Sequence, residues 1–125
     1  MLLDPDASRS AVPAAAPRRG TGRGPGARLR AALLELAGNH GELLTHSEKP
    51  WASITFSGTR HRVELQFRGE DAVEAGECFN AFLPEHEFAI PGQLVADASV
   101  VETEHRLLPE PELRMTAELL LLDDA

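Results

Sequence analysis

A two-residue alternation of apolar and polar side chains over residues 51–68 constrains this chain more than any other feature. Period two is typical of a strand with one buried face. The alternation breaks only at Gly58-Thr59, so it predicts a β-hairpin with strands at 51–57 and 60–68. The predicted inward side chains are Ala52, Ile54, Phe56, His61, Val63, Leu65 and Phe67.

Gly58-Thr59 predicts the turn of this hairpin. Glycine at the first central position suits a type II′ turn, because that position needs a positive φ. A two-residue loop there pairs Phe56 with His61 and Ile54 with Val63. The turn and the alternation thus predict the same register, with Phe56 and Ile54 in the core.

Two helices flank the predicted hairpin. Residues 27–37 carry apolar side chains at helical spacing and end at Gly38-Asn39, which tolerate the C-cap conformation. A second helix begins after Gly69 and stops before Pro84. Its predicted buried stripe is Ala72, Ala75, Gly76, Phe79, Phe82 and Leu83. Cys78 lies beside this stripe and is expected to be a small buried side chain, not a nucleophile.

The C-terminal third predicts a second pair of strands. Residues 94–107 alternate with Leu94, Ala96, Ala98 and Val100 on one face. Pro109 and Pro111 require a loop, since proline cannot donate to a strand ladder. The last strand carries Leu113, Met115, Ala117, Leu119 and Leu121 on one face. Residues 40–50 are expected to be a loop.

Together these elements predict an α+β fold in a single domain, residues 27–123. The expected architecture is a two-layer sandwich in αββαββ order, with a four-stranded antiparallel sheet and two helices on one face. The first strand pairs with the second and the third with the fourth. The remaining strand order is left open.

The composition of residues 1–26, rich in Ala, Pro, Gly and Arg, predicts a disordered basic tail. Residues 1–30 hold six arginines against two aspartates, whereas the rest of the chain holds six basic and eighteen acidic residues. Three interpretations of the tail remain open. It is a solvated segment without a role, a tether to nucleic acid, or a stretch upstream of the true translation start.

Composition argues against several classes of protein. An acidic body repels phosphate, so nucleic acid is not an expected partner except through residues 1–26. One cysteine allows no intrachain disulfide. No apolar run reaches the ~18 residues of a membrane span, and the N-terminus lacks a signal-peptide core. A cytoplasmic protein without membrane attachment is therefore expected.

No motif in the sequence predicts a catalytic residue, a metal ligand or a cofactor. The five histidines lack metal-ligand spacing, and no phosphate loop or nucleophile elbow is present. The better candidate for binding is the outer sheet face, where an aromatic anchor and several guanidinium groups are expected together. The candidate binding residues are Trp51, Arg60, Arg62, Arg68 and Arg114, with His61 on the inner face.

These observations favour a non-enzymatic binding or interaction module that acts as a homodimer, through a strand edge or the Trp51 face. The alternative is a small enzyme, or a binder of an anionic metabolite or protein partner, that uses the arginine-bearing face and His61. A third hypothesis is the nucleic-acid tether in the tail. Sequence alone does not decide whether the chain is an enzyme.

Overall fold

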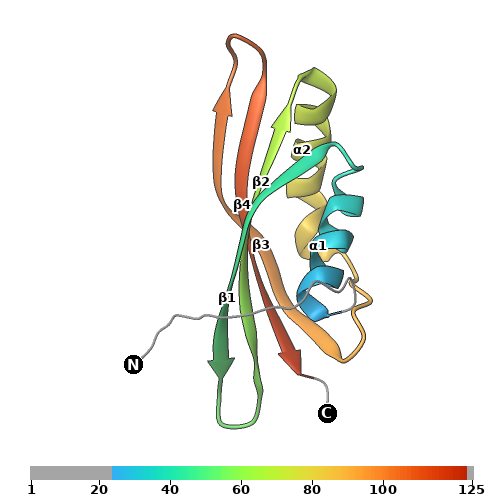
Figure 1. Cartoon of the computed structure of the whole chain (residues 1–125), viewed down its shortest axis with the longest axis vertical. Helices are drawn as coiled ribbons and strands as arrows, with labels where there is room; N and C mark the ends of the chain where they lie inside the picture. The colour runs from blue at the N-terminus through green and yellow to red at the C-terminus, as the bar shows by residue number, and fades with distance from the viewer. Residues whose placement is uncertain (1–23, 124–125) are drawn as a thin grey trace.

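The computed structural model describes residues 24–123, which form a layer of strands and a layer of helices (Figure 1). The elements are α1 (Pro25–Leu36), β1 (Gly41–Ala52), β2 (Ser57–Arg68), α2 (Glu70–Phe82), the short 3-10 helix η1 (Leu83–Glu85), β3 (Gln93–Arg106) and β4 (Glu112–Asp123). The sheet is antiparallel throughout, with strand order β1-β2-β4-β3. The predicted α+β class and αββαββ order are confirmed.

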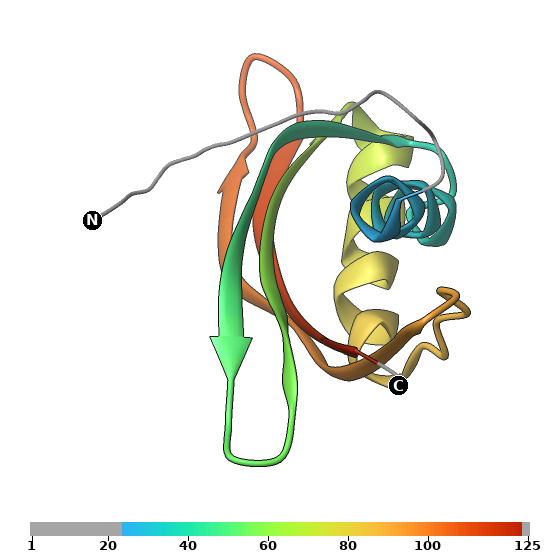
Figure 2. The same ribbon diagram turned by 60° about the horizontal axis from the view of Figure 1, so that its bottom comes forward.

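Both helices cover the same face of the sheet, which curves around them (Figure 2). α1 begins at Pro25, two residues before the predicted boundary, and proline suits this position because its missing N–H has no intrahelical acceptor. The predicted tail, residues 1–26, lies outside the described residues except for 24–26. None of the helices within residues 24–123 has the length and apolar character needed to span a membrane.

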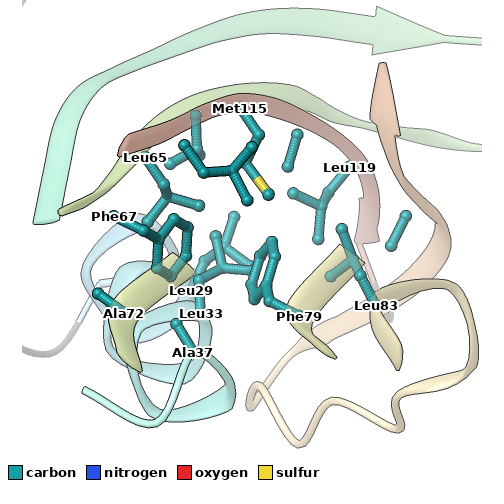
Figure 3. Close-up of a cluster of buried hydrophobic side chains, with 14 of the residues drawn as sticks. Leu29, Leu33, Ala37, Leu65, Phe67, Ala72, Phe79, Leu83, Met115 and Leu119 are labelled. Carbon is teal, nitrogen blue, oxygen red and sulfur yellow. The ribbon is translucent and has the colours of Figure 1, made fainter. Parts of the chain in front are cut away.

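The core lies between the helices and the two central strands (Figure 3). β2 and β4 alternate as predicted, and their inward side chains are buried against α1 and α2. Phe67 and Phe79 pack with ring centroids 6.3 Å apart. The buried apolar side chains on the helix-facing side of β2 and β4 are Val63, Leu65, Phe67, Leu113, Met115, Ala117, Leu119 and Leu121.

The predicted position of the first strand is wrong. β1 occupies Gly41–Ala52, most of which was expected to be a loop, and residues 53–56 form the connection to β2. The pairing runs from Ala52 opposite Ser57 to Glu48 opposite His61, so Phe56 does not face His61. Ile54 and Phe56 lie in the connection and are exposed, not part of the core.

The turn is therefore made by other residues than Gly58-Thr59. The backbone N–H of Ser53 donates to the carbonyl of Phe56 at 2.7 Å, and the N–H of Phe56 donates to the hydroxyl of Ser53 at 3.1 Å. Gly58 lies inside β2 without a positive φ. A Cβ at Gly58 would stand 2.1 Å from the carbonyl oxygen of Leu121, so glycine allows β4 to approach closely here.

Two bulges change which residues of β3 face the helices. The pairing with β4 shifts between Val95 and Asp97 and again between Val100 and Glu102. Each bulge inserts one extra residue and reverses the alternation beyond it. Ala98 and Val100 consequently face inward as predicted, whereas Leu94 points outward and is exposed.

The buried stripe of α2 is also displaced from the predicted one, toward Val73, which the prediction did not include. Ala72, Val73, Gly76 and Phe79 are buried, but Phe82 and Cys78 are exposed. Successive residues are about 100° apart around a helix. Cys78 therefore lies well to one side of Phe79, on the solvent side of the helix.

Candidate functional site

A hydrogen-bonded pair of buried histidines lies between the β1–β2 hairpin and α1. The side chain of His46 in β1 is 6% exposed, and His61 in β2 is 2% exposed. The Nε2 of His46 lies 2.9 Å from the Nδ1 of His61. Arg30 of α1 completes the group, with its Nη1 2.8 Å from the Nδ1 of His46. The β1–β2 register brings the two imidazoles together, because Glu48 stands opposite His61 and His46 lies two residues away on the same face.

The hydrogen bonds assign a proton position to each ring. A guanidinium group only donates, so the Nδ1 of His46 accepts from Arg30 and its proton lies on Nε2. That Nε2–H then donates to the Nδ1 of His61, whose own proton lies on Nε2. The arrangement is a one-way chain from Arg30 through His46 to His61, with both imidazoles neutral.

The surroundings keep these imidazoles neutral well into the acid range. Burial, together with the neighbouring His61 and Arg30, lowers the pKa of His46 from 6.5 to about 3. Burial and Arg30 lower the pKa of His61 to about 4. A neutral group in this position satisfies the hydrogen bonds without the cost of a buried charge.

Among the described residues, His46, Glu48 and His61 form a group that could hold a metal ion, with their ligand atoms within 4.8 Å of one another. An ion would need the lone pairs on the Nε2 of His46 and the Nδ1 of His61. Arg30, however, fixes a proton on that Nε2 and places a positive charge beside the ring. The geometry thus fits a hydrogen-bonded chain better than a cation site.

The register places five of the six predicted binding residues on the outer face of the sheet. They are Trp51, Arg60, Arg62, Arg68 and Arg114, which share the side opposite the helices. His61 lies on the helix-facing side, so the sheet separates it from all four arginines. The structure does not bring His61 and the arginines into one pocket.

Carboxylates accompany the central arginines of the outer face. Arg62 donates to Glu118 and, at 3.2 Å, to Glu102. Arg114 lies 4.0 Å from Glu64 and 3.9 Å from Glu112. A depression of about 400 Å³ beside Arg114 is lined by Glu64, Glu102, Thr103, Glu104 and Thr116. The balance of charge here leaves little attraction for an anionic ligand.

The ends of the two hairpins carry apolar side chains that sequence analysis did not identify as surface features. Both hairpins reach beyond the helices, at opposite ends of the molecule (Figure 1). Ile54 is 102% and Phe56 53% exposed at the end of the β1–β2 hairpin. Leu107 is 68% and Leu108 78% exposed at the end of the β3–β4 hairpin. Leu107-Leu108 next to Pro109 was the available signal, since apolar residues in a loop have no strand face to occupy.

The free edges of the sheet are interrupted. β1 carries Pro50 and a bulge between Leu43 and Thr45, and β3 carries two bulges. These features hinder the addition of a further strand at either edge of the sheet.

Comparison with known proteins gives a likeness of fold. No protein-family model matches the chain, and no curated protein matches it in sequence. A chain in the solved structure titled "Virion of native gene transfer agent (GTA) particle" is similar in fold, with a TM-score of 0.54 and 12% sequence identity. The similarity covers 76% of this chain and 89% of that chain.

Proposed function

We propose that the protein is a non-enzymatic, cytoplasmic interaction module that associates with further copies of itself, in the simplest case as a homodimer. The observation that carries this proposal is the exposure of Ile54, Phe56, Leu107 and Leu108 at the two hairpin ends. Large apolar side chains grouped at projecting ends favour contact with protein, because burying them releases water at about 25 cal/mol per Å².

Two further observations support an assembly function over catalysis. His61 is enclosed in a neutral hydrogen-bonded chain, and the central arginines of the outer face are paired with carboxylates. Neither arrangement leaves a titratable group free to act on a substrate. The structural neighbour is a chain of a virion, and a place within a protein assembly is the function that this likeness favours as well.

The mass of the protein in solution tests the proposal. Light scattering over a range of concentrations should give at least two copies for the wild-type chain. The Ile54→Ser/Phe56→Ser variant should be shifted toward the monomer, since it removes apolar surface that lies outside the core. Phe82→Ser is the matched control, because Phe82 is exposed on α2, outside both hairpins. A wild-type chain that remains monomeric at every concentration would refute self-association.

A further inference from the structure

The two hairpin ends differ in charge as well as in position. The basic tip, defined here as residues 49–60, contains Lys49 and Arg60 and no acidic residue, for a net charge of +2. The acidic tip, residues 102–114, contains four glutamates and two arginines, for a net charge of −2. Figure 2 shows the two ends projecting in opposite directions from the helix layer.

The basic tip combines apolar surface with unpaired cations. Lys49 and Arg60 stand opposite each other in the β1–β2 pairing, and neither has an ion pair within residues 24–123. Trp51 lies on the same outer face two residues nearer the end. Exposed Ile54 and Phe56 complete the tip. An acidic partner with an apolar centre would satisfy both kinds of group.

The acidic tip offers that chemistry. Leu107 and Leu108 supply the apolar centre, and Glu104 and Glu110 flank them in the chain. The depression lined by three glutamates adjoins this tip along β3 and β4. Charged groups on the rim of an apolar contact guide association and exclude wrong partners more than they add affinity.

From this complementarity we propose that copies of the chain associate head to tail, with the basic tip of one copy seated on the acidic tip of the next. The inference rests on the self-association proposed above and specifies its geometry. A symmetric contact between two basic tips would bring Lys49 and Arg60 against the same cations, and a contact between two acidic tips would oppose glutamates. A head-to-tail contact avoids both repulsions and continues into a chain or closes into a ring.

Mixing two complementary variants tests this geometry. Ile54→Ser/Phe56→Ser removes the apolar centre of the basic tip, and Leu107→Ser/Leu108→Ser removes that of the acidic tip. Each variant alone has lost one half of every contact, so each should be monomeric by light scattering. An equimolar mixture retains one intact basic tip and one intact acidic tip, so it should form a complex of two copies and nothing larger.

The outcomes separate the geometry from the proposed function. If one variant alone keeps the wild-type mass, the contact is symmetric and uses only the other tip; the head-to-tail inference then fails while self-association stands. If the mixture remains monomeric although the wild-type chain associates, the inference fails likewise. A monomeric wild-type chain refutes the proposed function itself. Unchanged melting temperatures show that the variants are folded.

Charge-reversal variants provide a second test of the head-to-tail contact, in which the apolar residues of both tips are retained. Lys49→Glu/Arg60→Glu and Glu104→Lys/Glu110→Lys should each reduce association at low salt. Mixing the two variants should restore the assembly with alternating copies, since the reversed basic tip of one meets the reversed acidic tip of the other, and their unchanged tips also have opposite charge. Equal association of each variant alone and of the wild-type chain would contradict the proposed complementarity.

Discussion

The imidazoles of His46 and His61 share a hydrogen bond of 2.9 Å across neighbouring strands, with Arg30 of α1 donating to the far side of His46. The chain of hydrogen bonds from Arg30 through His46 to His61 ties α1 to the β1–β2 hairpin at a place where the core is not apolar. It persists only while both rings are neutral, because a second proton on either accepting nitrogen would set two donors against each other.

We therefore expect the free energy of unfolding to fall as the pH is lowered from about 6.5 toward about 4. Unfolded imidazoles take up protons near pH 6.5, whereas the folded pKa values are about 3 and about 4. The contribution to stability is complete above pH 6.5 and is lost on acidification. Unfolding then takes up nearly two protons, which corresponds to about 2.5 kcal/mol per pH unit near pH 5. Urea unfolding measured across this range gives the slope.

Two variants isolate this effect from the protonation of carboxylates. His46→Leu/His61→Leu should flatten the dependence over the same range, because neither site can bind a proton. His40→Gln should leave it unchanged, since His40 is exposed. An equally steep slope in the double leucine variant would mean that other groups cause the acid sensitivity.

Gly58→Ala should destabilise the protein by at least about 2 kcal/mol, in the upper part of the range for overpacking. The added Cβ would stand 2.1 Å from the carbonyl oxygen of Leu121, and a backbone atom can move only by separating β2 from β4. Gly24→Ala is the control, since no side chain or backbone atom beyond its chain neighbours lies within 4 Å of its Cβ position among residues 24–123. Thermal unfolding of both variants measures the difference, and equal melting temperatures would contradict the close approach.

Phe56→Ala should change the free energy of unfolding by no more than about 0.5 kcal/mol, the range for surface positions. Phe67→Ala should cost about 3–5 kcal/mol, because Phe67 is fully buried between α2 and the sheet. Urea unfolding at a concentration low enough to keep the chain monomeric separates packing from association. A large cost at Phe56 would restore the register in which that ring belongs to the core.

Gly76→Ala sets helix propensity against packing. Alanine favours a helix interior by about 1 kcal/mol over glycine. Its Cβ, however, would stand 2.9 Å from the side chains of both Phe67 and Leu113, and overpacking a buried contact costs about 1–3 kcal/mol. We expect net destabilisation in a urea titration, with Glu77→Ala on the exposed side of α2 as the control. Net stabilisation would show that α2 can move away from the sheet at little cost.

The central strands were predictable from sequence because each buries one complete face. β2 and β4 lie between other strands and beneath the helices, so their inward positions had to be apolar at every second residue. α2 was predictable for a similar reason, and Pro84 marked its end. The bulges in β3 were not predictable from the sequence. An inserted residue among small and apolar side chains does not visibly change the apolar–polar pattern.

β1 escaped prediction because it is an edge strand whose helix-facing positions include His46 and Glu48. Polar residues there remove the alternation that identifies a strand, while Ile54 and Phe56 in the following turn continue it by coincidence. The useful signal was His61 itself. An imidazole within the apolar face of β2 needs a hydrogen-bond partner, and a neighbouring strand with inward polar groups is where that partner is found.

The strand order β1-β2-β4-β3 also bears on how the chain folds. Each hairpin closes between neighbouring segments, but β2 and β4 meet only after α2, η1 and β3 have been traversed. Closing that long connection costs entropy before its contacts repay it. We therefore expect the joining of the two hairpins to limit the rate of folding, so that in stopped-flow refolding substitutions along the β2–β4 boundary slow folding more than those within either hairpin.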